Sequence, residues 1–159
     1  MSLEKEIKQR IDTVSHEALL SIVHTANQLD LLSSRYFTQF GVTQAQYNLL
    51  IIIKLENRSL TQVELSERMV SSRANITSLI DKLEKKEYVR RVSVEGDRRV
   101  YGVELTQAGL KKVSDIEPKY VNKVKSIMDG FSDKESRQLS MLLEKVRFAV
   151  KSLEGKNEK

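Results

Sequence analysis

The fold is decided by residues 61–105, which read TQVELSERMVSSRANITSLIDKLEKKEYVRRVSVEGDRRVYGVEL. The first half of this stretch carries two apolar patterns with helical spacing, separated by only a few residues. Thr61 and Glu64 have the Thr-x-x-Glu spacing of a capping box, and Ser71 or Ser72 can cap the second helix. Two short helices joined by so tight a turn predict a helix-turn-helix.

The second half of the stretch predicts a β-hairpin. Residues 88–94 and 100–105 are rich in β-branched and aromatic side chains and alternate in polarity, as strands do. Between them lie residues 95–99, a short segment that contains Gly96 and ends in two arginines. A helix-turn-helix followed at once by a hairpin with a basic tip is typical of a winged helix-turn-helix. We therefore predict a mainly α fold with a small β-hairpin wing.

The segment before this module has the pattern of two helices. Apolar residues recur at three- and four-residue steps over residues 6–40, which predicts one long helix that ends at Gly41 in a left-handed cap. Thr43 begins a Thr-x-x-Gln capping box, followed by a helix that is apolar on most sides. We place an N-terminal dimerisation helix over residues 1–40 and the winged helix-turn-helix domain over residues 41–106.

The C-terminal part predicts further helices. Thr106 opens a helix that runs to about Met128, and Pro118 inside it removes a backbone donor, so we expect this helix to kink or to split in two. Ser132 begins a last capping box, followed by a helix with leucine and valine side chains at seven-residue intervals. These C-terminal dimerisation helices form the third predicted region, residues 107–155.

Composition limits the chemistry that the chain can perform. Its 27 basic and 22 acidic side chains give a formal net charge of +5, which suits a polyanionic partner. The absence of Cys excludes disulfides, thiolate catalysis and Cys-ligated zinc. His16 and His24 lie about 12 Å apart along a helix axis and about 80° around it, too far to chelate one metal. The sequence also lacks a Gly-rich phosphate loop and clustered carboxylates, so we predict no cofactor, no metal site and no enzyme.

The winged helix offers two sets of side chains that suit duplex DNA. Near the start of the second helix of the pair, short hydroxyl and amide side chains and a guanidinium can reach base edges and phosphates in the major groove. In the hairpin, Asp97 can brace one arginine while the other enters a minor groove. The predicted DNA-contacting residues are Thr61, Ser71, Ser72, Arg73, Asn75, Thr77, Arg98 and Arg99.

Each of these residues also has a purely structural explanation. Thr61, Ser71 and Ser72 are helix caps first, and a residue such as Arg73 is often solvated surface. A basic pair in a hairpin directly after a helix-turn-helix favours DNA contact. The alternative is a winged helix that binds another protein and no DNA.

Several motifs are specific in combination. They are Val42-Thr43-Gln44-Ala45-Gln46-Tyr47, Leu65-Ser66-Glu67-Arg68, the stretch from Asn75 to Lys86, and Asp97-Arg98-Arg99 followed by the stretch from Val103 to Gly109. With these motifs and its long first helix, the sequence resembles the MarR family of bacterial transcription regulators over nearly its whole length. The resemblance implies a dimeric winged-helix repressor or activator, with a reading helix in the major groove and a wing arginine in the flanking minor groove. It also implies that Asp97 pairs with Arg99 to shape the wing.

One position departs from the family pattern. Where the family usually has Gly after the fourth helix, this chain has Glu87. Glu87 must either accept a left-handed conformation or end the helix differently, and the direction in which the wing leaves the helix depends on this choice.

The terminal helices offer material for a homodimer. A domain of this size would have difficulty covering two long helices with its own surface. A two-fold dimer would place its reading helices roughly 34 Å apart, one turn of B-DNA, which suits a pseudo-palindromic site. The predicted interface residues are Ile7, Ile11, Leu139, Leu142, Val146 and Leu153.

The resemblance further implies regulation by a small-molecule effector, whose pocket residues the sequence does not identify. The N-terminus is charged and no apolar run is long enough to span a bilayer, so we expect a cytoplasmic protein with no membrane partner, associated with the nucleoid. We therefore predict a ligand-responsive repressor that binds double-stranded operator DNA as a dimer.

Overall fold

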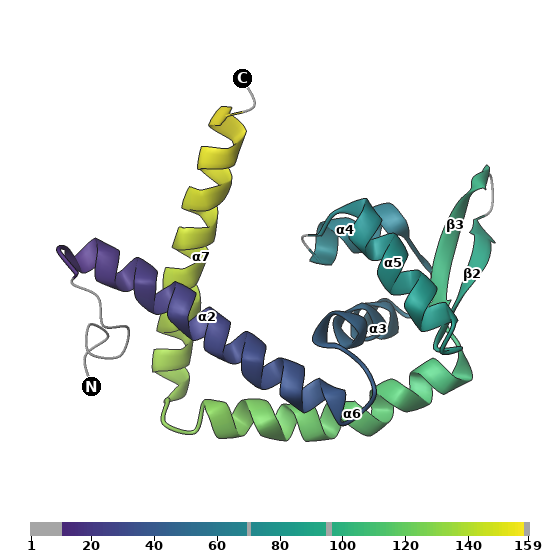
Figure 1. The fold of residues 1–159 in the computed structure, drawn as a ribbon, viewed down its shortest axis with the longest axis horizontal. Coiled ribbons are helices and arrows are strands. Elements are labelled where there is room, and N and C mark those ends of the chain that lie inside the picture. Colours follow the sequence, from purple (N-terminus) through teal and green to yellow (C-terminus); the bar gives the residue numbers. More distant parts are fainter. Residues whose placement is uncertain (1–10, 70, 95–96, 158–159) are drawn as a thin grey trace. The chain divides into compact units, whose positions relative to one another are not determined.

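The computed structural model of the chain describes residues 11–69, 71–94 and 97–157 (Figure 1), without the side chains of residues 94, 97–100 and 154–157. The chain divides into two compact units, residues 1–114 and 115–159. Helices predominate and the strands form one small antiparallel sheet, as the sequence predicts. The elements are α2 (Val14–Thr38), α3 (Gln44–Glu56), β1 (Leu60–Thr61), α4 (Gln62–Met69), α5 (Arg73–Glu84), β2 (Val89–Val94), β3 (Asp97–Leu105), α6 (Gln107–Ile127) and α7 (Asp133–Asn157).

The helix-turn-helix is confirmed, and its two helices start at predicted caps. Before α4, the Thr61 N–H and hydroxyl donate to the Glu64 carboxylate at 2.8 and 2.9 Å, and the Glu64 N–H donates to Thr61 Oγ1 at 3.3 Å. Ser72, and not Ser71, caps α5, because its Oγ accepts the Asn75 N–H at 3.3 Å. Each cap satisfies amides at the start of a helix that have no partner within the helix.

The helices α3, α4 and α5 and the three strands, which together we call the reading module, share one apolar core. Its side chains come from the inner faces of α3, α4 and α5 and from the sheet, and burial of each contributes roughly 1.5–3 kcal/mol. In α5, Ile76 and Ile80 are fully buried, so the helix turns its polar N-terminal residues outward. The fully or almost fully buried residues of this core are Leu49, Leu50, Leu60, Leu65, Ile76, Ile80, Leu83, Val89 and Val103.

The wing belongs to a three-stranded antiparallel sheet in the order β1-β3-β2. The strands β2 and β3 form the predicted hairpin, with a bulge between Ser93 and Val94. However, β3 already begins at Asp97, so the two arginines expected at the tip belong to a strand instead. The paired strands therefore extend further towards residues 95–96 than the alternation of side chains indicated.

The strand β1 was not predicted. It has two residues, with Leu60 paired to Val103 and Thr61 paired to Gly102. The approach is close because Gly102 lacks a side chain: a Cβ there would lie 2.8 Å from Ser59 Oγ. Two residues are too few to produce an alternating pattern, so this strand has no signal in the sequence.

The first long helix starts later than predicted. Residues 11–13 are not helical, and Thr13 caps α2 by accepting the His16 N–H at 3.1 Å. The prediction of one helix over residues 6–40 is therefore wrong at its start, because apolar periodicity alone does not show where a capping side chain ends the pattern. After α2, Gly41 has the expected positive φ of 69°.

Pro118 does not split its helix. α6 is continuous from Gln107 to Ile127 with Pro118 inside it, so of the two predicted outcomes the split is excluded and the kink stays a prediction. Proline removes the hydrogen bond that its amide would give to the carbonyl four residues earlier, at Ser114. Ser114 is exposed, so water can satisfy this carbonyl and the helix continues.

The turn between α5 and β2 is left-handed at Glu87, with φ 59°. The Glu87 N–H donates to the Glu84 carbonyl at 2.8 Å. The Tyr88 N–H donates to the Leu83 carbonyl at 3.0 Å, which completes the two hydrogen bonds of a Schellman motif. Glutamate therefore takes the conformation that glycine would take, and the wing leaves α5 through a glycine-type cap.

The start of α6 closes on this turn. The Thr106 hydroxyl donates to the Glu87 carbonyl at 2.5 Å, and the Thr106 N–H donates to the Tyr88 carbonyl at 3.1 Å. Gly109 follows in the first turn of α6, and its N–H donates to Thr106 Oγ1 at 3.0 Å. A Cβ at Gly109 would lie 1.9 Å from the Tyr88 carbonyl oxygen. The two segments thus meet backbone against backbone.

We expect Gly109→Ala to destabilise the protein by about 1–3 kcal/mol, because the new methyl group must displace the Tyr88 backbone. Without this overlap, a Gly to Ala change inside a helix stabilises by up to about 1 kcal/mol. Urea unfolding followed by circular dichroism measures the difference. Gly130→Ala is the control, because a Cβ at Gly130 meets no atom within 4 Å. A Gly109→Ala protein as stable as the wild type would contradict this packing.

Candidate nucleic-acid interface

The N-terminal end of α5 is the part of the module that presents polar groups outward. Arg73 and Asn75 are exposed, and neither side chain has a hydrogen-bond or ion-pair partner among the described residues. Thr77 is half-buried, and its hydroxyl donates to the Arg73 carbonyl at 2.9 Å. The positive end of the helix dipole lies at the same place, beside the Ser72 cap. This combination of a free guanidinium, a free amide and helix N–H groups suits a partner whose surface is anionic and forms hydrogen bonds.

Two other predicted contact residues form hydrogen bonds within the protein. The Thr61 hydroxyl is taken up by the capping box with Glu64, and Thr61 also pairs with Gly102 in the sheet. Ser71 is half-buried, and its N–H donates to the Ser66 carbonyl at 3.0 Å. The structural explanation therefore accounts for Thr61, whereas Ser71 does not act as a helix cap and only its backbone N–H is accounted for.

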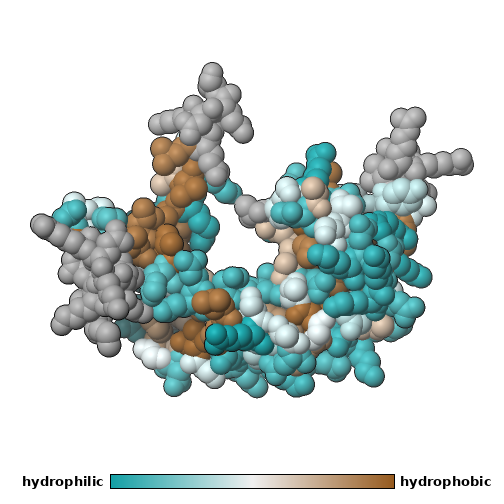
Figure 2. All heavy atoms as spheres, in the orientation of Figure 1, coloured by the Kyte–Doolittle hydropathy of each residue, from teal (hydrophilic) through white to brown (hydrophobic). Residues whose placement is uncertain are grey.

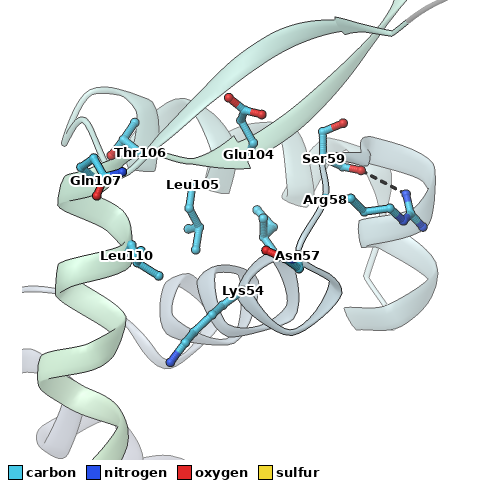
Figure 3. A pocket seen from close by; sticks show the side chains of 10 residues that line it. Lys54, Asn57, Arg58, Ser59, Glu104, Leu105, Thr106, Gln107 and Leu110 are labelled. Atoms are coloured by element: carbon cyan, nitrogen blue, oxygen red, sulfur yellow. Dashed lines mark hydrogen bonds between the residues drawn. The ribbon is translucent and has the colours of Figure 1, made fainter.

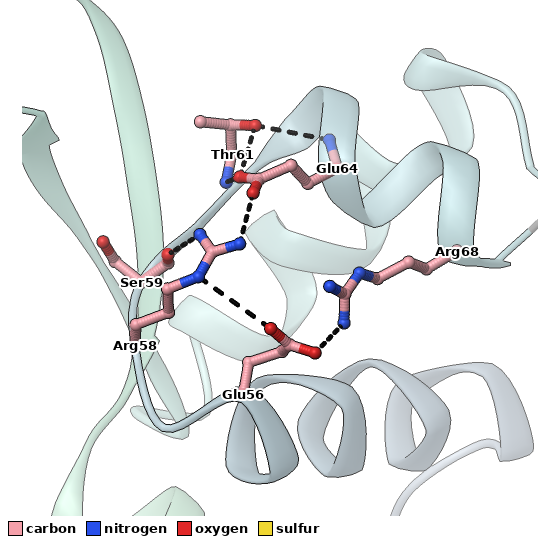
Figure 4. Close-up of polar contacts among 6 residues, drawn as sticks. All are labelled: Glu56, Arg58, Ser59, Thr61, Glu64 and Arg68. Atoms are coloured by element: carbon pink, nitrogen blue, oxygen red, sulfur yellow. Dashed lines mark hydrogen bonds and ion pairs between the residues drawn. The ribbon is translucent and has the colours of Figure 1, made fainter.

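A network of four charged side chains that the sequence did not reveal fixes the start of α4 (Figure 4). The Arg58 guanidinium donates to Glu64 Oε1 at 2.6 Å and to the Ser59 carbonyl at 3.0 Å. Glu56 at the end of α3 lies 3.9 Å from Arg58 and forms a short ion pair with Arg68 at the end of α4. The network joins the end of α3 to both ends of α4.

The network also sets the ionisation of Glu64. The hydrogen bond from Arg58, with those from the Thr61 N–H and hydroxyl, lowers the pKa of Glu64 from its ordinary value of 4.5 to about 2. The hydrogen bond from Arg68 lowers the pKa of Glu56 as well. Both carboxylates are therefore charged at neutral pH, and each belongs to the architecture of the helix-turn-helix.

Acidic side chains of α5 bind an arginine of the wing. The Arg91 guanidinium contacts Asp81 at 2.5 Å and forms a short ion pair with Glu84. On the preceding residue of β2, Arg90 pairs across the hairpin with Glu104 at 2.6 Å. These two arginines are therefore held by carboxylates, which leaves other cationic side chains to make any contact with phosphate.

The predicted wing residues Asp97, Arg98 and Arg99 form the first part of β3. Their side chains lie outside the described part of the structure, so the pairing of Asp97 with Arg99 stays a prediction. The backbone places Asp97 opposite Val94, next to residues 95–96.

A cavity of about 410 Å³ lies at the base of the wing (Figure 3). The side chains of Leu105 and Leu110 point into it, and Asn57 faces them from the end of α3. Arg58 turns away from it towards the Ser59 carbonyl. The lining residues are Ile53, Lys54, Asn57, Arg58, Ser59, Glu104, Leu105, Thr106, Gln107 and Leu110.

Neither a metal centre nor a membrane span was found in the described residues. No three histidine, aspartate or glutamate side chains in residues 11–69, 71–94 and 97–157 come together as ligands for an ion. Over the same ranges, no helix has the length and apolarity needed to cross a bilayer.

We expect Glu64→Gln to lower the melting temperature at pH 7, because the charged carboxylate stabilises the start of α4. The lowered pKa means that this stabilisation is complete above about pH 4.5 and is lost as the pH falls towards about 2. The gap between wild type and variant should therefore shrink over that window, as measured by thermal denaturation. Glu67→Gln, an exposed change on the same helix, is the control. A gap that is constant from pH 7 to pH 2 would rule out this ionisation as the cause.

Comparison with known proteins finds similarity to one family of regulators. Residues 42–101 match the model of the MarR family. The HTH-type transcriptional repressor YetL of Bacillus subtilis (strain 168) is 26% identical over 139 residues, which cover 87% of this chain and 83% of that protein. The transcriptional repressor MprA of Escherichia coli (strain K12) is 29% identical over 115 residues, which cover 72% of this chain and 65% of that protein.

Solved structures agree with this match. AbsC, a MarR family transcriptional regulator from Streptomyces coelicolor, has a TM-score of 0.80 at 21% identity, over 91% of this chain and 99% of that chain. A mutant MarR from E. coli complexed with operator DNA has a TM-score of 0.74 at 25% identity, over 85% of this chain and 99% of that chain. The sequence motifs, the winged helix and these matches lead to one conclusion: residues 42–101 match the MarR family, and the chain is similar to transcriptional regulators over most of its length.

Proposed function

We propose that the protein is a transcriptional repressor that binds a specific sequence of double-stranded DNA. The observation that carries the proposal is the exposed N-terminal end of α5, where Arg73 and Asn75 have no partner among the described residues. The same helix is fixed from behind by its buried apolar face. The relative YetL is named a repressor, and the similar MarR of E. coli forms a complex with operator DNA.

In this proposal α5 enters the major groove with its N-terminal end leading. A guanidinium reads guanine through two hydrogen bonds, and a side-chain amide reads adenine in the same way. Arg73 and Asn75 supply these two groups, while the first N–H groups of α5, which precede the Asn75 N–H that Ser72 caps, suit a phosphate. Arg98 and Arg99 on β3 are proposed to reach the flanking minor groove. The DNA-binding domain comprises residues 41–106.

The protein is proposed to act as a homodimer through residues 1–40 and 107–155. Apolar side chains gather on α7, as Figure 2 shows, and four of them are at least half exposed: Met141, Leu142, Phe148 and Leu153. Leu139 is 40% exposed and Val146 is half-buried. So much apolar surface is typical of an interface. Ile7 lies outside the described residues, and Ile11 precedes α2, so the N-terminal contribution rests on α2 itself.

The proposed effector is a small molecule, because the cavity at the base of the wing has the size of a small-molecule site. Its apolar side chains, Leu105 and Leu110, come from β3 and α6, and Asn57 adds a hydrogen-bonding amide. An occupant would touch the wing and α6 together and could favour one arrangement of the reading module over another. A DNA-bound regulator of this kind acts in the cytoplasm, on the nucleoid, and performs no catalysis.

We expect Arg73→Ala to weaken binding to the operator about tenfold or more, because a bidentate contact to a base is worth about 1–3 kcal/mol. The Arg98→Ala and Arg99→Ala double variant should lower the slope of log affinity against log salt by about 1–2, one for each phosphate that the variant no longer neutralises. Fluorescence anisotropy against a duplex selected from a random pool measures both. Lys134→Ala at the start of α7 is a control that removes one positive charge outside the module.

Unaltered affinity and salt dependence in both variants would show that the reading surface is wrong. If the wild-type protein selects no duplex and instead forms a salt-independent complex with a protein, the function is that of a protein-binding winged helix.

We expect Leu142→Glu combined with Leu153→Glu to convert the dimer to a monomer, because each change places a charge in an apolar interface. Analytical ultracentrifugation measures the mass. Gln138→Glu, an exposed polar position on the same helix, should remain dimeric. A wild-type protein that sediments as a monomer at micromolar concentration would exclude this interface.

A further inference from the structure

Two lysines from different elements meet at the end of α2. The Lys86 ammonium donates to the Gly41 carbonyl at 2.5 Å. The Lys112 ammonium donates to the Phe40 carbonyl at 3.3 Å. The donors and acceptors are far apart in sequence, and all four residues belong to the first compact unit. We call Phe40, Gly41, Lys86, Tyr88 and Lys112 the lysine junction.

The acceptor side of the junction is the turn that directly follows the C-terminal end of α2. The chain leaves α2 through two tight hydrogen bonds, from Phe40 N–H to the Phe37 carbonyl and from Gly41 N–H to the Thr38 carbonyl, at 3.0 and 2.9 Å. Gly41 then reverses the backbone at positive φ. The Phe40 and Gly41 carbonyls lie just beyond the end of α2, and each accepts a charge-assisted hydrogen bond from an ammonium group.

The donor side links the parts that are proposed to read DNA. Lys86 lies between the end of α5 and the left-handed residue Glu87. Lys112 lies on α6, and its ammonium is 5.5 Å from the centre of the Tyr88 ring, one residue before β2. The junction therefore ties the end of α2 to the end of the reading helix, the start of the wing and the start of α6.

We propose that Lys86 and Lys112 are positioning residues that hold α5 at a fixed orientation to α2 and so set the spacing of the DNA half-sites that a dimer accepts. The proposal rests on the proposed function, in which α2 is part of the dimer and α5 reads DNA. α5 has 12 residues and is roughly 18 Å long, so a rotation of roughly 10° about the junction at its C-terminal end moves its N-terminal end by roughly 3 Å. One base pair added between half-sites shifts them by roughly 3.4 Å along the duplex axis.

The first experiment measures orientation without DNA. Because the chain has no Cys, Asn27→Cys on α2 and Ser78→Cys on α5 provide two unique sites for spin labels. Pulsed electron paramagnetic resonance gives the distance between them, and excess unlabelled protein removes signals between chains. We expect a narrow distribution in the wild type and a wider or shifted one in the Lys86→Met, Lys112→Met variant. Lys85→Met, Lys111→Met is the control with the same charge loss on neighbouring residues.

The second experiment measures spacing selectivity. The selected operator is compared with duplexes that have one base pair inserted or removed between the half-sites. The wild type and the control variant should lose about tenfold in affinity on altered spacing, similar to the cost of a mismatched base pair. The Lys86→Met, Lys112→Met variant should lose only about twofold to threefold in affinity when the spacing is altered. A general loss of positive charge lowers the affinity for all duplexes alike and does not change this ratio. Lys86→Arg, Lys112→Arg, which keeps both donors, should restore the wild-type ratio.

The outcomes separate the two proposals. An unchanged distance distribution in the methionine variant overturns the positioning role, whether or not the protein binds DNA. A wider distribution with an unchanged spacing ratio overturns the link to half-site selection. Failure of the wild type to bind any duplex is a failure of the proposed function, and it also removes half-site selection, while the distance measurement still decides the positioning role. If the double variant does not fold, the single variants Lys86→Met and Lys112→Met are measured in the same way.

Discussion

The close approach of Gly109 to the Tyr88 carbonyl is the constraint on which the arrangement of the reading module depends. No side chain fits between the start of α6 and the turn that ends α5, so the two segments meet through backbone atoms. Thr106 hydrogen bonds to both residues of that turn. The direction of the wing, the end of the reading helix and the beginning of α6 are thereby fixed at one point.

Most arginines described in the reading module form ion pairs with carboxylates that stabilise the fold, and Arg73 differs from them. Glu64 and Glu56 hold Arg58 and Arg68 at the two ends of α4, and Arg91 is held by the acidic residues of α5. The cationic side chains that build the fold are thus neutralised by partners close at hand. Arg73 has none among the described residues, and it lies at the positive end of α5, where an anion is attracted rather than repelled.

The sequence was most informative where one residue acts on its close neighbours. The caps at Thr43, Ser72 and Ser132 and the left-handed Gly41 were predictable because each is a local pattern of three or four residues. The strand β1 was not, because it exists only through pairing with β3. The Arg58 network was missed for the same reason: its members lie on separate elements, and their meeting depends on how α3 and α4 pack. The continuity of α6 through Pro118 was not predictable either, because apolar periodicity does not show whether the carbonyl that loses its hydrogen bond is exposed.

The bulge between Ser93 and Val94 divides the hairpin into two parts with different freedom to change. On its inner side, Val89 and Val103 are buried and their register is tied to the core. Opposite it on β3, Arg98, Arg99 and Val100 fall between Asp97, which pairs with Val94, and Tyr101, which pairs with Ser93. An irregularity in the ladder absorbs a change of length or twist before it reaches the paired residues behind it. We therefore expect the residues opposite the bulge to tolerate substitutions, and even a change of length, while the paired strands behind them and the folded core are preserved.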